Sequence, residues 1–335
     1  MTSIRSARAR RVGLAAGAAA ALGLAAVAMA SPAGAAPAPS ASVANDTLTV
    51  TGTNASEHLA LRLQAGAPGL LDVDFGDDGT AEFSFDRATF SHIAVFLRGG
   101  DDQFRVDQTN GSFPDEALTV DGGNGNDTLN GGDGAEIFYG GNGEDSVDGN
   151  KGNDTAYLGN GADTFTWDPG DGSDIVEGQN GVDTLHFNGA GVALENMFLT
   201  PNGTRALFHR DQGNINMDMD GVERLGLDAL GGVDTIRIDD MSGTDLRRAD
   251  IDLGGADGAV DVLTVNGTSN DDRVRVVTDG AGVDVKGLQP LTRITGSEPT
   301  DQLKINTLDG NDRVTVDGTV FGLISPTTDL GAGQL

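Results

Sequence analysis

Short runs of alternating apolar and polar residues recur along most of the chain, as in D-T-L-T-V at 46–50, D-T-I-R-I at 234–238 and D-R-V-T-V at 312–316. Alternation with a period of two is typical of β-strands that bury one face. Apolar triplets also return every ten or eleven residues on both sides of the middle of the chain. They begin near Leu48, Leu59, Val73, Phe83, Ile93 and Phe104, and again near Leu263, Val274, Val283, Ile294, Leu303 and Val314. The pattern predicts an all-β chain of many short strands.

Between residues 122 and 186 the pattern tightens to a nine-residue unit, G-G-x-G-x-D-x-U-x, in which U is a large apolar residue. Five units run without a break to Thr166, a two-residue insertion follows (Trp167 and Asp168), and two further units occupy 169–186. The fourth place is always glycine: Gly125, Gly134, Gly143, Gly152, Gly161, Gly172 and Gly181. The sixth place is always acidic: Asp127, Glu136, Asp145, Asp154, Asp163, Asp174 and Asp183. The eighth place should point inward as a ladder of core side chains: Leu129, Phe138, Val147, Ala156, Phe165, Val176 and Leu185.

Each place of this unit has a physical role. Glycine permits the positive φ angles of a tight turn and leaves backbone carbonyls uncovered. In a coil of two units, equivalent acids recur every eighteen residues and lie about 4.8 Å apart, the spacing of neighbouring strands. Two unit charges about 4 Å apart repel by roughly 4 kcal/mol at an effective dielectric constant near 20. Stacked carboxylates therefore predict a bound cation between them.

Calcium fits this pattern best, because it takes about six to eight oxygen ligands and tolerates a mixture of carboxylates and carbonyls. Magnesium requires a stricter octahedron and keeps its waters. Zinc prefers histidine and cysteine, which the repeat motif lacks.

Residues 122–186 resemble the calcium-binding nonapeptide repeats of RTX proteins, also called hemolysin-type repeats. The resemblance implies a right-handed parallel β-roll, a β-helix-like solenoid with two nonapeptides per turn and calcium between the turns of repeats n and n+2. One edge would carry Asp127, Asp145, Asp163 and Asp183, and the opposite edge Glu136, Asp154 and Asp174. Carbonyls of the glycine turns would complete the sites, with help from third-place side chains, and three to five calcium ions would be bound. The implied ligand set is Gly123, Asn124, Gly125, Asp127, Asp133, Gly134, Glu136, Gly141, Asn142, Gly143, Asp145, Gly152, Asp154, Gly161, Asp163, Asp171, Gly172, Asp174, Gly181 and Asp183.

The two flanks repeat less plainly, and four segments are expected: a signal peptide at 1–36, an N-terminal β module at 37–121, the RTX block at 122–186 and a C-terminal β-solenoid module at 187–335. We expect the flanks to be degenerate coils continuous with the roll. A separate antiparallel sandwich is the alternative, since R-V-R-V-V-T-D-G-A-G-V-D-V from residue 273 would form a hairpin. Asp102, Asp234 and Asp312 follow glycine-containing turns in the flanks, where isolated aspartates are more often turn residues than ligands. Asp312 is expected to have no in-register neighbour.

The first forty residues read as an export signal. Arg5, Arg8, Arg10 and Arg11 precede an uncharged, alanine-rich run, and an A-x-A site follows at 33–35. An uncleaved membrane anchor is the alternative, because the uncharged run approaches the length of a bilayer span, and the Arg10 and Arg11 pair leaves Sec and twin-arginine export open. We expect cleavage, no membrane span afterwards, and a secreted, extracellular protein whose association with the cell surface is open.

Removal of that signal leaves 17 of the 21 basic residues against 51 acidic residues, a formal charge of −34. Such a surface repels nucleic acid and anionic membranes and attracts cations. The chain has no cysteine, so disulfides cannot hold its loops.

The search for catalytic signatures favours a non-enzyme. His58, His92, His186 and His209 are scattered, and neither H-E-x-x-H nor G-x-S-x-G occurs. Only Lys151, Lys286 and Lys304 supply lysine, which is little for a lyase acting on acidic sugars. Tyr139 and Tyr157 share the ninth place and should stack on one outer face. The sequence thus predicts a secreted, non-catalytic, calcium-binding protein. The alternatives are a module that binds carbohydrate or adheres to surface polysaccharide, and a lyase or epimerase of the β-helix type.

Overall fold

The structure is a computed structural model that describes residues 38–191, 194–255 and 257–331. These residues belong to one compact unit, Ala38–Leu335. The signal expected at 1–36 lies outside the described residues. The described part consists of strands and three short 3₁₀ helices, η1 (Arg87–Thr89), η2 (Gln212–Asn214) and η3 (Val320–Gly322). None of its helices has the length and apolar character needed to cross a membrane.

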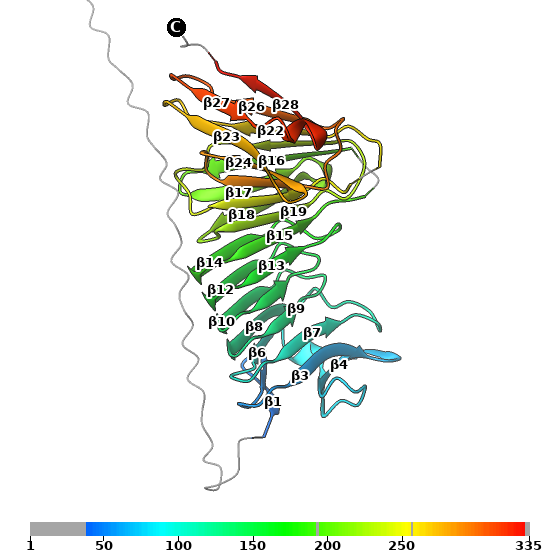
Figure 1. The fold of residues 1–335 in the computed structure, drawn as a ribbon. Coiled ribbons are helices and arrows are strands. Elements are labelled where there is room, and N and C mark those ends of the chain that lie inside the picture. The colour runs from blue at the N-terminus through cyan, green and yellow to red at the C-terminus, as the bar shows by residue number, and fades with distance from the viewer. Residues whose placement is uncertain (1–37, 192–193, 256, 332–335) are drawn as a thin grey trace, which may run out of the picture. The chain divides into compact units, whose positions relative to one another are not determined.

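The strands form two sheets of fourteen, here called sheet A and sheet B (Figure 1). In spatial order sheet A contains β1 (Ser40–Ala44), β2 (Thr47–Thr51), β6 (His92–Phe96), β8 (Ala117–Asn124), β10 (Ile137–Asn142), β12 (Thr155–Gly161), β14 (Ile175–Gly181), β18 (Ile215–Asp220), β17 (Arg205–Arg210), β16 (Glu195–Asn202), β20 (Asp234–Ile238), β22 (Val262–Asn266), β26 (Gln302–Asn306) and β28 (Ser325–Asp329). Sheet B contains β27 (Arg313–Val316), β23 (Arg273–Asp279), β24 (Gly282–Lys286), β25 (Leu291–Thr295), β21 (Arg248–Asp252), β19 (Arg224–Asp228), β15 (Thr184–Asn188), β13 (Thr164–Trp167), β11 (Ser146–Asp148), β9 (Thr128–Asn130), β7 (Gln103–Asp107), β3 (His58–Gln64), β4 (Ala67–Phe75) and β5 (Phe83–Asp86).

The repeat block winds as a coil that places one strand in each sheet per turn. Successive strands of one sheet pair in parallel, with Ile137 opposite both Thr119 and Thr155, and with Ser146 opposite both Thr128 and Thr164. All four of these pairs join residues eighteen positions apart, so two nonapeptides make one turn. The all-β parallel solenoid predicted from the sequence is confirmed.

The insertion at Trp167 and Asp168 widens one turn without breaking the coil. Thr155 pairs with Ile175 and Thr164 with Thr184, so the register here lengthens to twenty residues. The Trp167 ring is fully buried and stacks on Phe187 with centroids 4.0 Å apart. Its indole N–H donates to the Gly172 carbonyl at 2.8 Å, which fixes the widened turn.

The core lies between the two sheets. All seven eighth-place residues point into it, and each is at most 1% exposed. The neighbouring strand positions alternate outward, as the period of two predicts. The inward ladder expected from the sequence is confirmed.

Three antiparallel excursions are inserted into this winding: β3–β4–β5 and β23–β24–β25 in sheet B, and β16–β17–β18 in sheet A. At the sheet A excursion the coil lengthens to forty residues, as the pairing of Thr184 with Arg224 shows. The hairpin expected from residue 273 forms as β23 and β24, but it lies within the solenoid sheet. The flanks are therefore coils continuous with the repeat block, and the alternative of a separate sandwich is wrong for the described residues.

Candidate metal centre

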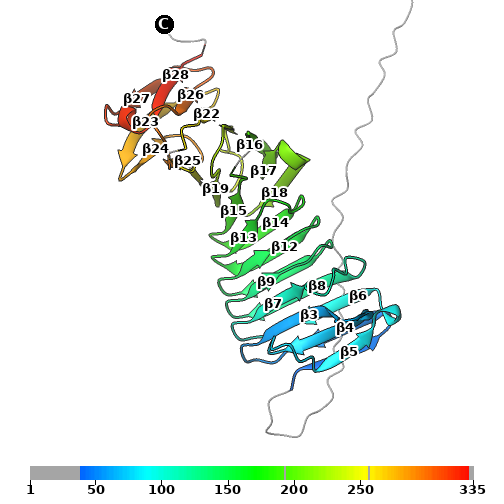
Figure 2. The ribbon, with the colours of Figure 1, turned by 90° about the vertical axis from the view of Figure 1, so that its right-hand side faces the viewer.

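The turns of successive rungs lie above one another at both edges of the stack (Figure 2). Their close approach depends on the fourth-place glycines. Gly143 has φ +140°, and a Cβ there would lie 1.9 Å from the carbonyl oxygen of Gly125, one rung away. Only a residue without a side chain fits, so each turn presents bare carbonyls to the next.

The sixth-place acids form a row on each edge, and each of them lies on the edge that the sequence predicts. On the edge between a sheet A strand and the following sheet B strand, four aspartates accept the backbone N–H of the aspartate one rung earlier through Oδ1, at 2.7–2.9 Å: Asp127, Asp145, Asp163 and Asp183. This edge, here called the aspartate row, contains Asp102, Asp127, Asp145, Asp163 and Asp183. On the opposite edge the N–H groups of Glu136 and Asp154 donate to Asp154 and Asp174 at 2.7 and 2.8 Å.

The second oxygen of each carboxylate in the aspartate row has no partner. Oδ2 of all five aspartates, and of Asp154 on the opposite edge, is buried without a hydrogen bond among the described residues. A buried carboxylate oxygen without a partner is costly, because it has lost water and gained nothing in return. Six such atoms in neighbouring rungs indicate a place for a cation.

The titration of these groups follows from the same burial. Burial raises the pKa of Asp145 to about 7 and that of Asp154 to about 9, although the backbone N–H that each accepts lowers it, and neighbouring acids raise it further. Burial likewise raises the pKa of Asp174 to about 7 and that of Asp183 to about 6. The ionised rows are therefore unfavourable without a counter-ion.

Backbone oxygens lie close to the carboxylate oxygens that have no partner. A Cβ on Gly122 would lie 2.5 Å from Asp127 Oδ2 and 2.7 Å from the Gly140 carbonyl oxygen. Gly140 repeats this arrangement with Asp145 Oδ2 at 2.7 Å and the Leu158 carbonyl at 2.3 Å. At Gly122 and Gly140, a carboxylate oxygen and a carbonyl oxygen thus both lie against the glycine, where any side chain would displace them. Within the described ranges no three His, Cys, Asp or Glu side chains come together as a metal cluster, so a cation here must use carbonyls. That mixed oxygen set fits calcium.

The third-place side chains have partners of their own. On the aspartate row's edge four side chains form an amide ladder, in which the Nδ2 of each of the last three donates to the Oδ1 one rung earlier at 2.7–2.9 Å: Asn124, Asn142, Asn160 and Asn180. On the opposite edge Asp133 lies 3.2 Å from the Lys151 ammonium. Glu136 also differs from the aspartates, because its longer side chain accepts the Gly132 N–H at 3.1 Å.

The structure adds acids that the sequence left isolated. Asp102 joins the aspartate row, and the expectation that Asp312 has no in-register neighbour is wrong, because Asp312 Oδ1 accepts the Asp272 N–H at 2.8 Å. Asp234 stacks on Asp261 in the same way at 2.8 Å. The glycine-containing turn before Asp102 fits a wider motif, x-x-x-G-x-D-x-U-x, which L-R-G-G-D-D-Q-F-R at 97–105 satisfies.

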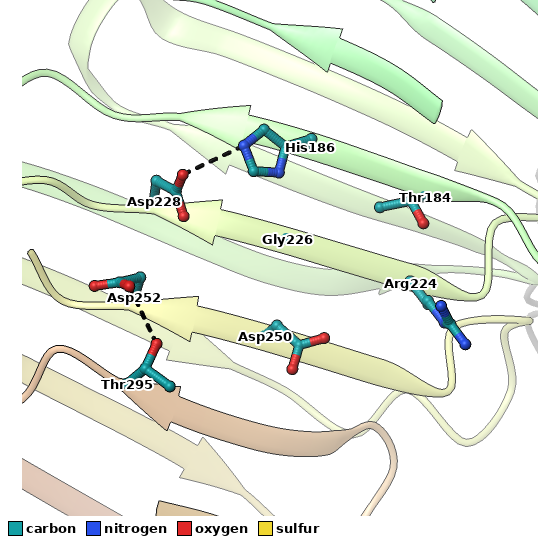
Figure 3. A pocket seen from close by; sticks show the side chains of 8 residues that line it. All are labelled: Thr184, His186, Arg224, Gly226, Asp228, Asp250, Asp252 and Thr295. Atoms are coloured by element: carbon teal, nitrogen blue, oxygen red, sulfur yellow. Dashed lines mark hydrogen bonds and ion pairs between the residues drawn. The ribbon is translucent and has the colours of Figure 1, made fainter. Parts of the chain in front are cut away.

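A separate polar hollow of about 320 Å³ lies on the outer face of sheet B, over β15, β19, β21 and β25 (Figure 3). In it His186 points toward Asp228, with Nε2 3.3 Å from the carboxylate, and the Thr295 hydroxyl donates to Asp252 at 3.2 Å. The remaining lining residues are Thr184, Arg224, Gly226 and Asp250.

Residues 119–147, 139–166 and 170–189 match the family model of the RTX calcium-binding nonapeptide repeat (four copies). No curated protein matches the chain. The chain therefore contains RTX repeats, which are calcium-binding, in the region where the two rows of acids lie.

Proposed function

We propose that this is a secreted, non-catalytic protein in which calcium ions between the stacked turns drive folding and stabilise the solenoid. The observation that carries the proposal is the row of buried carboxylate oxygens without partners in the repeat turns. The proposed ligands are the sixth-place acids and the carbonyls of the glycine turns. Calcium would neutralise pairs of stacked carboxylates and supply the missing bonds of their Oδ2 atoms.

The expected number of ions follows from the stacking of the rungs. Repeats one with three, two with four, and three with five give three sites within the unbroken units. Two more, four with six and five with seven, use rungs that stay paired across the insertion at Trp167. We therefore expect three to five ions in the repeat block.

Export supports this role. The basic, alanine-rich leader and the A-x-A site favour secretion, and extracellular calcium modules typically bind at about 10⁻⁴–10⁻³ M. The sites would then be empty at cytoplasmic calcium concentrations and filled after export. Binding free energy would become folding free energy at that point.

The test counts calcium on the whole mature chain and follows its folding. Native mass spectrometry in millimolar calcium should give at least three ions, and circular dichroism should show β structure growing when calcium replaces chelator. Magnesium at the same concentration is the control. A count of zero or one, or a β spectrum produced equally by magnesium, would contradict the proposal.

A second candidate function is binding of an extracellular or cell-surface polysaccharide, for which the tyrosine pair gives the specific support. Tyr139 and Tyr157 are register partners on the outer face of sheet A, and their rings stack with centroids 5.0 Å apart at 9°. Tyr139 is 41% exposed, so a sugar ring could lie against it. Depletion of the chain by insoluble polysaccharide, lost in Tyr139→Ala, would support this role; equal depletion of the variant would exclude the pair.

A further inference from the structure

We infer that calcium binding along the aspartate row continues one rung beyond the repeats that the family model matches. The additional calcium site would lie between the turn 97–102 and the turn 122–127. The inference rests on the proposed function, since it takes calcium as the ion that fills the row. The matched repeats begin at residue 119, so the turn 97–102 lies outside them. Its sequence, L-R-G-G-D-D, lacks the first two glycines of the motif.

The backbone of this turn nevertheless repeats that of the nonapeptide turns. Gly100 has φ +117°, close to the +129° of Gly125, and Arg98 takes φ +82° at the place where the repeats have a positive-φ glycine. The Gly100 N–H donates to the Asn124 carbonyl at 2.9 Å, as the Gly125 N–H donates to Asn142 at 2.8 Å. The turn 97–102 therefore stacks on 122–127 as the repeats stack on one another.

The carbonyl contact between the two turns is also preserved. A Cβ on Gly125 would lie 1.7 Å from the Gly100 carbonyl oxygen, compared with 1.9 Å between a Cβ on Gly143 and the Gly125 carbonyl. The close approach of a carbonyl oxygen to the fourth-place glycine of the next turn, seen between repeats, is thus present between the turn 97–102 and the first repeat.

Asp102 supplies the carboxylate. It is 1% exposed, its Oδ1 accepts the Glu57 N–H at 2.6 Å, and its own N–H donates to Asp127 Oδ1 at 2.8 Å. Its Oδ2 is buried without a hydrogen-bond partner among the described residues, as in the four aspartates that follow it. Asp102 therefore resembles a repeat aspartate in its position, in its burial and in having one carboxylate oxygen without a hydrogen-bond partner.

The next rung shows where the row ends. Glu57 occupies the equivalent place, but both of its carboxylate oxygens have donors, since Oε2 accepts the Thr53 N–H at 3.0 Å and Oε1 accepts the Thr53 hydroxyl. Thr53 thus provides the partners of the Glu57 carboxylate, whereas the open oxygen of Asp102 would be bound by a cation. One additional site is expected at this end of the row, and no second one.

The experiment compares Asp102→Asn with Asp101→Asn in the full mature chain. Asparagine keeps the Oδ1 acceptor at residue 102 and replaces only the open oxygen. Asp101 is its exposed neighbour, whose Oδ1 accepts the Asn126 N–H at 2.9 Å, so its variant makes the same change of charge on the same turn. Native mass spectrometry in excess calcium should show one ion fewer in Asp102→Asn and an unchanged count in Asp101→Asn.

A second measurement needs no substitution. In the unchanged chain, hydrogen exchange at 97–102 should slow as calcium is added, in step with exchange at 122–127. Equal ion counts in both variants, or exchange at 97–102 that ignores calcium, would overturn the inference. Binding of several ions by the unchanged chain with no loss in Asp102→Asn would refute the additional site alone, whereas an unchanged chain that binds no calcium would refute the proposed function itself.

Discussion

Substitution of Asp145 by asparagine should change stability in opposite directions with and without calcium. Asp145 lies in the middle of the aspartate row, accepting the Asp127 N–H through Oδ1 and donating its own N–H to Asp163. Asparagine keeps both bonds, because its Oδ1 remains an acceptor. Only Oδ2, the buried oxygen without a partner, is replaced.

The magnitude follows from the two sites that Asp145 would share with Asp127 and Asp163. Each independent site contributes about 2.7 kcal/mol when calcium is at a hundredfold excess over its dissociation constant. Loss of both sites should therefore lower the free energy of unfolding in calcium by about 5 kcal/mol, a large part of the total for a typical domain. In chelator the variant should be at least as stable as the unchanged chain. Burial raises the pKa of Asp145 to about 7, which shows that its ionised form is unfavourable there, and the substitution removes that charge.

The assay is urea unfolding followed by circular dichroism, in millimolar calcium and in chelator. Glu144→Gln is the matched control, since this exposed neighbour on the same turn undergoes the same change of charge. The control should match the unchanged chain in both media. An equal loss in calcium and in chelator would show that Asp145 acts through packing alone, and the reasoning would fail.

Three further predictions follow from the turns. Gly143→Ala should destabilise the chain by about 3 kcal/mol or more, because of the positive φ and the 1.9 Å approach to Gly125, whereas Gly318→Ala, with no atom within 4 Å, should be nearly neutral in the same melts. In chelator the melting temperature should fall as pH rises from about 4 toward 9. Burial raises the pKa of folded Asp145 to about 7 and that of Asp154 to about 9, above the ordinary aspartate value of 3.8, so the stability present at low pH is lost as the acids ionise. A flat profile would contradict this. In chelator the backbone amides of 122–186 should lose protection against hydrogen exchange before those of the excursions at β3–β5 and β16–β18. Simultaneous loss of protection would show that calcium controls the whole solenoid.

The sequence predicted the solenoid because its period is rigid where the fold is most regular. Nine-residue spacing sets the eighteen-residue register, and the seven inward residues from Leu129 to Leu185 follow from it. The same spacing placed the sixth-place acids on two edges. It could not show that one oxygen of each aspartate is bonded while the other is left open, because that depends on the turn geometry of two rungs at once.

The stacking partners of Asp102 and Asp312 could not be predicted from the sequence, because they lie at other distances along the chain than eighteen residues. Asp102 stacks on Asp127 across 25 residues, and Asp272 stacks on Asp312 across 40. The turn after β7 and the antiparallel strands β24 and β25 lengthen these coils without shifting the rungs out of register. A constant period in the sequence reveals only coils of constant length. The repeat block has such a period, whereas the acids of the flanking rungs look isolated.

On the edge that carries Glu136 and Asp154, two acids beyond the repeat block are neutralised by arginine instead of by a bound cation. Arg87, in the first excursion, binds both oxygens of Glu116 at 2.6 and 2.8 Å, and Arg210, at the end of β17, pairs with the fully buried Glu195. A guanidinium thus lies beside an acid at two of the three excursions, on the edge that carries Glu136 and Asp154, and that counter-charge is covalently attached. Within the described ranges no ion pair of this kind reaches the five aspartates of the aspartate row, whose Oδ2 atoms are buried without a hydrogen bond. Dependence on calcium should therefore follow the aspartate row, where the turns provide carboxylates and carbonyls and the described residues place no cation beside them.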